Sequence, residues 1–278
     1  MTDRCEQRAA RVAEDMEIFT VLRGALDDDD LAQLRGHCRA HLDRDDAIPC
    51  YVMLDALDSP VVGKLRELVE AEIGARPHYL NDFYFYSDDA FGAGWHMDTE
   101  LFTFDRCVNV WILLGPEEVA SPLAVIPDLN TTAAQYFHSV GREDDELVFA
   151  NYRTGKKHSR ESSAVEETKI DAPVVRLGDV LLFDPKHFHR TNTTAPKHAI
   201  VFKFVFEGDG GFRSATQVPS LFWPEVKMFN TMLADTADWD QFLAALRQKL
   251  TTDDGRTALS AGFFPEKTEL YQEMAATL

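Results

Sequence analysis

The sequence predicts a mainly β fold with flanking helices, built around a barrel or sandwich of two antiparallel sheets. Between residues 81 and 206 the chain consists of short runs rich in Phe, Tyr, Val and Ile, which Gly, Pro, Asn and Asp separate. No helix stands between the runs at each step, which argues against the strand–helix alternation of a parallel sheet. A chain of 278 residues with 45% hydrophobic residues is long enough to bury such a core.

The N-terminal part, residues 1–80, is expected to form a helical flank that packs on the core. The acidic residues 27–30 supply an N-cap and first-turn negative charge to a helix. The apolar stripe of this helix is Leu31, Leu34, Cys38 and Leu42. A second helix is expected over about residues 60–73, because Gly74 follows it as a natural end point.

The core, residues 81–206, contains a polar excursion at residues 130–172 that is expected to form a lid or loop outside the barrel. Residues 207–278 form a helical C-terminal extension, and the chain as a whole is expected to be one domain. The apolar stripe of this extension could join two copies in a homodimer, and it consists of Phe242, Leu243, Leu246 and Leu250. The strands expected in the core are residues 83–86, 107–114, 123–126, 174–177, 180–183 and 199–206.

Composition and charge exclude several classes of protein. With 47 acidic and 28 basic residues the net charge is −19, which would repel a phosphate backbone, so a nucleic-acid partner is not expected. The longest apolar runs fall far short of the roughly 20 residues that a membrane span needs. The charged N-terminus resembles no secretory signal, and the four cysteines have no CxxC spacing, so we expect reduced thiols and a cytoplasmic location.

Three residues form the candidate metal site: His96, Asp98 and His189. In an extended strand, side chains two residues apart point to the same face, so the spacing of His96 and Asp98 suits a chelate carried by a strand. Two imidazoles and one carboxylate on one face of a ferrous ion leave three positions open, enough for a bidentate 2-oxo acid and dioxygen.

Four segments form a pattern in this order: residues 19–27, residues 95–98, residues 108–114 followed by 121–127, and residues 178–189. In this pattern the sequence resembles the Fe(II)/2-oxoglutarate dioxygenases, and most closely their phytanoyl-CoA-hydroxylase-like branch. The resemblance covers about residues 17–206. It implies a double-stranded β-helix core of the jelly-roll, cupin-like type. It also implies an enzyme that binds Fe(II) and uses 2-oxoglutarate and O2 as co-substrates to oxidise a C–H bond of a small organic substrate.

The resemblance also refines the choice of ligands and of reaction. In the family the distal histidine stands eleven residues after the glycine, and His189 stands eleven residues after Gly178, which selects His189 over His187. Relatives that halogenate carry Gly or Ala in place of the carboxylate. Because Asp98 is present, the resemblance implies hydroxylation or a related oxidation and not chlorination.

The residue that anchors the distal carboxylate of 2-oxoglutarate departs from the family pattern. The family has an Arg about eleven residues after the distal histidine, where this chain has Ile200. Alignment by strand places Lys197 at the anchoring position, with a loop three residues shorter. Lys203, on the same strand face, and Arg190 are alternatives. A lysine would hold the carboxylate as a point charge, with less geometric definition than an Arg fork.

Three further residues are candidates for contact with the co-substrate or the ligands. Tyr86, or the nearby Tyr84, could hydrogen-bond the 2-oxo acid, although core aromatics are the simpler interpretation. Asn109 lies in an apolar strand, so it either lines the cavity or faces water. Thr193 could help to orient His189, or belong to a polar turn.

The sequence leaves three other functions open. One is an iron oxidase of the same fold that does not use 2-oxoglutarate. Another is a cupin-like hydrolase or isomerase that uses the same ligands with zinc or manganese and performs no redox chemistry. The last is a binding domain without catalysis that has kept the three ligands.

Overall fold

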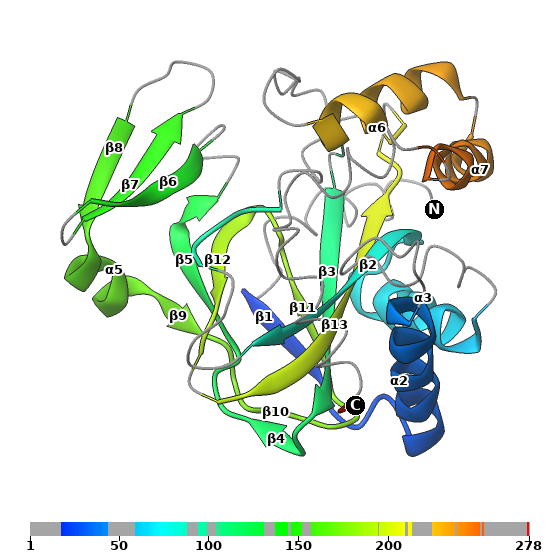
Figure 1. Cartoon of the computed structure of the whole chain (residues 1–278), viewed down its shortest axis with the longest axis horizontal. Coiled ribbons are helices and arrows are strands. Elements are labelled where there is room, and N and C mark those ends of the chain that lie inside the picture. The colour runs from blue at the N-terminus through cyan, green and yellow to red at the C-terminus, as the bar shows by residue number, and fades with distance from the viewer. Residues whose placement is uncertain are drawn as a thin grey trace, which may run out of the picture.

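The structure, a computed structural model, describes residues 18–43, 59–87, 94–98, 104, 106–130, 137–143, 146–151, 157–193, 195–208, 211–212, 224–236, 238–250, 252 and 277. Predictions that concern other residues, such as 1–17 and 44–58, lie outside the described part. The elements, drawn in Figure 1, are β1 (Phe19–Leu22), α2 (Asp28–Leu42), α3 (Pro60–Ile73), β2 (His78–Ser87), β3 (Arg106–Gly115), β4 (Glu118–Val119), β5 (Leu123–Asn130), β6 (Phe137–Glu143), β7 (Glu146–Asn151), β8 (Lys157–Glu161), α5 (Ser162–Thr168), β9 (Ile170–Asp171), β10 (Val175–Arg176), β11 (Val180–Phe183), β12 (His187–Thr191), β13 (Lys197–Phe206), α6 (Pro224–Asp235) and α7 (Trp239–Leu250).

Two antiparallel sheets form the centre of the molecule. The larger sheet has the strand order β1-β11-β3-β13-β2, and the smaller has the order β12-β5-β9. Leu123 and Val125 of the smaller sheet belong to the same buried cluster as the apolar residues of the larger one. The segment of residues 94–98 joins the smaller sheet, because His96 pairs with His189 on β12.

The chain alternates between the two sheets as it proceeds. It passes from β2 in the larger sheet to residues 94–98 in the smaller, returns to β3, crosses to β5, and later runs through β11, β12 and β13 in the same alternation. This winding is that of a jelly roll, or double-stranded β-helix. The predicted fold is therefore confirmed.

Helices α2 and α3 pack beside the larger sheet (Figure 1). Asp27 caps α2 in a reciprocal capping box with Asp30, as its acidic N-terminus predicts. Arg35 on α2 donates hydrogen bonds of 2.9 and 2.7 Å to the carbonyl of Leu114 on β3. Helix α3 ends at Gly74, whose φ of 73° is left-handed. The stripe predicted for α2 is buried, and it comprises Leu31, Leu34, Cys38 and Leu42.

Helices α6 and α7 form a second buried cluster with the larger sheet. Phe242, Leu243 and Leu246 of α7 are at most 6% exposed, in one cluster with Leu80 and Val205 of β2 and β13. These three side chains of the predicted dimer stripe are therefore used within the chain.

The described part of the predicted excursion, residues 130–172, contains strands and a helix and not only loop. Strands β6, β7 and β8 form a separate antiparallel sheet beside the two central ones, followed by α5 (Figure 1). The run 146–151 contains Leu, Val and Phe, which have a high β-propensity, and its pairing with both neighbours explains the sheet. Strands β6 to β8 lie outside the two central sheets, whereas β9, at the end of the predicted excursion, pairs with β5 in the smaller sheet. The excursion is therefore not a simple loop.

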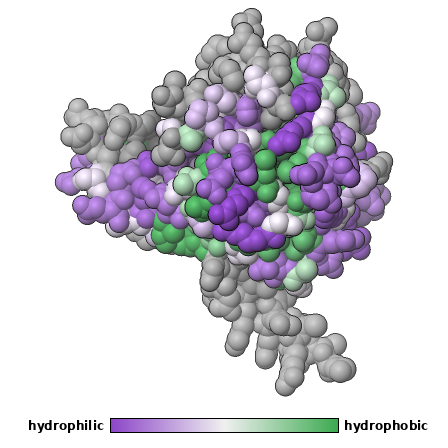
Figure 2. Space-filling view, turned by 90° about the horizontal axis from the view of Figure 1, so that it is seen from below, coloured by the Kyte–Doolittle hydropathy of each residue, from purple (hydrophilic) through white to green (hydrophobic). Residues whose placement is uncertain are grey.

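Large hydrophobic side chains are almost all covered in the described part of the chain. Figure 2 shows one face, on which hydrophilic residues surround smaller hydrophobic areas. Ile170 on β9, which is 39% exposed, is the only large hydrophobic side chain that is exposed in the described part of the chain. No helix in that part is long and apolar enough to cross a membrane.

Candidate metal centre

The backbone of the smaller sheet places the two histidines side by side. His96 and His189 exchange backbone hydrogen bonds of 2.9 Å in both directions, so they are directly opposed across the sheet edge. The centroids of their rings are 4.3 Å apart. Asp98 follows two residues later, and its backbone N–H donates to the carbonyl of Pro185. Pairing with β12 thus fixes the segment that carries two of the three candidate ligands.

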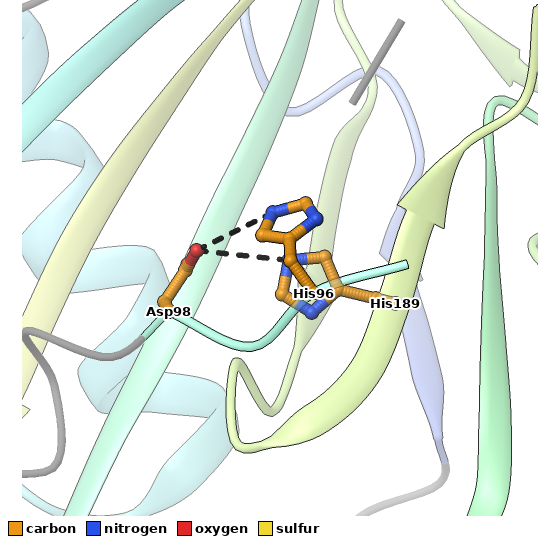
Figure 3. A group of neighbouring side chains, drawn as sticks. All are labelled: His96, Asp98 and His189. Atoms are coloured by element: carbon orange, nitrogen blue, oxygen red, sulfur yellow. Dashed lines mark ion pairs between the residues drawn. The ribbon is translucent and has the colours of Figure 1, made fainter. Parts of the chain in front are cut away.

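The side chains of His96, Asp98 and His189 converge on one point (Figure 3). The Oδ1 atom of Asp98 is 3.7 Å from Nε2 of His96 and 3.7 Å from Nε2 of His189. One ligand atom from each residue lies within 4.8 Å of the other two. Two imidazole nitrogens and one carboxylate oxygen in this arrangement fit a divalent transition metal such as iron.

Backbone carbonyls orient both imidazoles. Nδ1 of His96 is 2.6 Å from the carbonyl oxygen of Gly94, and Nδ1 of His189 is 2.9 Å from that of His187. A carbonyl only accepts, so the neutral rings carry their proton on Nδ1, and Nε2 presents its lone pair to the site. Burial, together with the facing His96 ring, lowers the pKa of His189 to about 3, so this ring is neutral near pH 7.

The second carboxylate oxygen of Asp98 faces the larger sheet. Asn109 on β3 donates a hydrogen bond of 2.6 Å from Nδ2 to Oδ2, and Nζ of Lys203 on β13 is 3.4 Å from the same oxygen. Burial opposes ionisation of this carboxyl. The charge of Lys203, the two imidazoles and the Asn109 hydrogen bond outweigh it and hold the pKa of Asp98 well below its usual value. Asp98 is therefore charged at any pH at which the protein would work.

Lys197 and Lys203 project from the same face of β13, which we call the inner face because Lys203 meets Asp98 there. The register of β13 is continuous, and irregularities fall on its partner strands. Lys197 is fully buried, and its ammonium donates to the carbonyls of Asn192 and, at 3.3 Å, Ala195. Ser87, directly opposite on β2, is also buried, and its hydroxyl has no hydrogen-bond partner.

The other predicted contact residues lie away from this arrangement. Tyr86 pairs with His198 on the opposite face of the larger sheet, where their ring centroids are 4.9 Å apart. Tyr84 lies on that face as well, with its hydroxyl 2.9 Å from Nδ1 of His198. Strand alternation therefore directs both tyrosines away from the metal centre, contrary to the role predicted for Tyr86. Thr193 is exposed in the turn after β12.

Arg190, the remaining candidate for an anchor, is engaged elsewhere. Its guanidinium forms two hydrogen bonds, of 2.5 and 2.9 Å, with the carboxylate of Glu166 on α5. It also lies 4.7 Å above the ring of Trp95. This side chain follows His189 directly, so alternation sends it to the other face of β12.

Fold and site together define a mononuclear non-haem iron dioxygenase with a double-stranded β-helix core. Residues 1–199 match the model of the family described as phytanoyl-CoA dioxygenase (PhyH). The chain therefore belongs to the phytanoyl-CoA dioxygenase family, and the match includes all three candidate ligands. The predicted class of enzyme, an Fe(II)- and 2-oxoglutarate-dependent dioxygenase, is confirmed. A comparison with curated proteins gave no match.

Solved structures with a similar fold share little sequence with this chain. The epimerase SnoN, crystallised with Fe3+, alpha ketoglutarate and nogalamycin RO, is 16% identical over 74% of this chain and 85% of its own, with a TM-score of 0.47. EctD from S. alaskensis with bound Fe is 17% identical over 77% of this chain and 81% of its own, with a TM-score of 0.46. HygX from Streptomyces hygroscopicus, with nickel and 2-oxoglutarate bound, is 16% identical over 74% of this chain and 93% of its own, with a TM-score of 0.44.

The contacts of Asp98 with Asn109 and Lys203 are not predicted from the sequence. The sequence predicts that Asn109 lines the cavity or faces water, and that Lys203 either anchors 2-oxoglutarate or reaches solvent at the end of a strand. The available signal is that Asn109 and Lys203 are polar and each lies within an apolar strand. A buried amide or ammonium needs a partner. Which partner it has depends on the register between β3 and β13.

Proposed function

We propose that the protein oxidises a C–H bond of a small organic substrate, by hydroxylation or a related oxidation, with Fe(II) bound by His96, Asp98 and His189. The observation that carries this proposal is the convergence of three side chains with free donor atoms, within a chain that matches a dioxygenase family. When bound, ferrous iron and 2-oxoglutarate supply the activation of O2 and the electrons for the oxidation. Chlorination is not proposed, because Asp98 fills the position that a halide would need.

The residues around the site supply binding and orientation. The carbonyls of Gly94 and His187 hold the two rings in the tautomer that a metal ligand requires. Burial keeps His189 neutral, so no proton has to leave this ring when the metal binds. The side chains of Asp98 and His189 are 11% and 5% exposed, so little water reaches them.

Lys197 is the anchor that we propose for the distal carboxylate of 2-oxoglutarate. Lys203 is paired with Asp98 and Arg190 with Glu166, so each of these two cations already has a carboxylate partner. The partners found for Lys197 are the carbonyls of Asn192 and Ala195, which take two of the three ammonium donors. The buried hydroxyl of Ser87, opposite Lys197, would add a second donor to the same carboxylate.

The proposed function is tested by metal loading and co-substrate turnover. Protein purified without oxygen and loaded with Fe(II) should release succinate and CO2 from 2-oxoglutarate in the presence of O2, and Asp98→Ala should abolish this. Oxygen uptake without succinate would instead indicate an iron oxidase that does not use 2-oxoglutarate. Native zinc or manganese without oxygen uptake would indicate a non-redox metal enzyme. Metal-independent ligand binding would indicate a domain without catalysis.

Three further predictions accompany this proposal. The acidic net charge of −19 supports the absence of a nucleic-acid partner. A cytoplasmic location stays a prediction from the sequence, as does a homodimer. Subunit number by sedimentation would test the homodimer, and the burial of Phe242 and Leu246 within the chain directs the search to other surfaces.

A further inference from the structure

The two oxygens of Asp98 have different surroundings. Oδ1 faces the two imidazole nitrogens, each at 3.7 Å. Oδ2 faces two protein donors, the amide of Asn109 at 2.6 Å and the ammonium of Lys203 at 3.4 Å. A carboxylate can bind a metal through one oxygen or through both. Here the protein occupies one oxygen and leaves the other for the ion.

Both donors to Asp98 lie side by side on neighbouring strands of the larger sheet. Lys203 and Asn109 are direct partners in the register between β13 and β3, so their side chains leave adjacent strands on the same face. Both are buried, at 5% and 1% exposure. The ammonium of Lys203 also lies over the ring of Phe83, with Nζ 5.9 Å from the ring centroid. The donors therefore sit on a rigid sheet, whereas Asp98 lies on a short connecting segment.

The amide of Asn109 is committed to this contact. Its Nδ2 donates to Asp98, and its Oδ1 is buried without a hydrogen-bond partner. A flipped amide would place two oxygens against each other, so Asp98 alone dictates the orientation of the side chain. A buried amide oxygen without a hydrogen-bond partner is costly. Because Asn109 keeps its contact with the Asp98 carboxylate despite this cost, the contact points to a role of Asn109 at that carboxylate.

We propose that Asn109 and Lys203 are positioning residues that keep Asp98 a one-oxygen ligand of the metal. Lys203 has a second effect, because it cancels the negative charge of Asp98. A ferrous ion in this site then keeps two uncompensated positive charges, which match the two negative charges of a bound 2-oxo dicarboxylate. This inference rests on the proposed function and assigns roles within the same site.

Cobalt(II) titration of the metal-free protein tests the role of Asn109 without turnover. Asn109→Leu should bind cobalt 10- to 100-fold more weakly, which is the usual cost of losing a group that orients a ligand. Its visible cobalt spectrum should also change, because a freed carboxylate can bind through both oxygens. Asn109→Ser, which is small and polar, should show a loss in the same direction if the leucine variant folds poorly.

Asn81 provides a matched control. It lies opposite Lys203 on the other neighbouring strand, β2, and is 1% exposed like Asn109, but neither of its side-chain polar atoms has a hydrogen-bond partner. Asn81→Leu repeats the substitution in the same row without touching Asp98, so it should leave cobalt affinity unchanged. Equal cobalt affinity in wild type, Asn109→Leu and Asn109→Ser would overturn the positioning role.

Two dianions, oxalate and 2-oxoglutarate, distinguish a charge-balancing role of Lys203 from direct binding of the distal carboxylate by Lys203. Oxalate chelates a metal as a 2-oxo acid does but lacks the distal carboxylate. In the cobalt-loaded protein, Lys203→Met should lower the affinity for oxalate and the affinity for 2-oxoglutarate by a similar factor of about ten or more. Lys203→Arg should restore both affinities. A loss of affinity for 2-oxoglutarate but not for oxalate would show that Lys203 binds the distal carboxylate, and it would overturn the charge role. A wild-type protein that binds no metal would refute the proposed function itself.

Discussion

At the scale of single residues, Lys197 is a buried lysine whose protonation governs the proposed anchor. Burial lowers its pKa from 10.5 to about 8. Only the ammonium form attracts a carboxylate, so the affinity for 2-oxoglutarate should fall as the pH rises through about 8. Binding of 2-oxoglutarate to the metal-loaded protein, measured without oxygen from about pH 6.5 to 9.5, checks this.

Lys197→Arg is the matched control for that measurement. Arginine stays protonated throughout this range, so the variant should bind 2-oxoglutarate without the inflection near pH 8. Oxalate, which has no distal carboxylate, should show no inflection in either protein. An inflection that persists in Lys197→Arg would assign the titration to another group and would count against Lys197 as the anchor.

The predictability of the site differs from residue to residue. His96 and Asp98 could be predicted as a pair because alternation in a strand is a local rule. The partnership of Asn109 and Lys203 with Asp98 could not, because it depends on which residues β3 and β13 bring opposite each other. The same limit explains Tyr86: alternation divides a strand into two faces, but only the assembled sheet decides which face meets the metal.

At the scale of elements, Gly178 fixes the turn before β11. Its φ is 85°, and a Cβ atom there would lie 2.6 Å from the carbonyl oxygen of Leu26. The N–H of Leu26 donates to the carbonyl of Gly178 at 2.9 Å, so the two backbones are in direct contact. The glycine that the resemblance identified therefore has a packing role, which is to let the start of α2 approach the larger sheet.

Replacement of Gly178 by alanine should be more destabilising than the same change at Gly24. Gly24 has a φ of 58° but open space around its Cβ position, so Gly24→Ala should cost about 1 kcal/mol from backbone strain alone. Gly178→Ala adds a clash with backbone and should cost at least about 2 to 3 kcal/mol. Urea unfolding of both variants measures the difference, and equal losses would show that the contact with Leu26 relaxes easily.

The elements that could be predicted are those with strong local signals. Helix α3 follows from its proline start and Gly74, and α2 from its acidic cap and apolar stripe. The sequence does not predict strands β6 to β8, because charged residues on both sides hide the short β-prone run at 146–151. Their stability comes from the pairing of the three strands with one another. This pairing cannot be predicted from a short stretch of sequence.

At the scale of the whole molecule, the metal centre joins the two sheets. The ligands His96, Asp98 and His189 belong to the smaller sheet and its edge segment, whereas the groups that hold Asp98, Asn109 and Lys203, belong to the larger sheet. An ion in the site would therefore link both layers of the fold. The hydrogen bond from Asn109 to Asp98 and the ion pair between Lys203 and Asp98 already make this link in the described structure.

Metal binding should consequently raise the stability of the entire fold and not only of the site. At a metal concentration of 100 times the dissociation constant the gain is about 2.7 kcal/mol, and each kcal/mol raises the Tm of a domain of this size by roughly 2 to 4 °C. Calorimetry of the metal-free protein with and without cobalt(II) measures this, and a chelator should reverse the shift. Asp98→Ala should lose most of it, because the carboxylate is both a ligand and the link between the sheets. If that variant instead gained as much stability from the metal as wild type, the ion would be binding elsewhere on the acidic surface, and the site between the sheets would not be the metal centre.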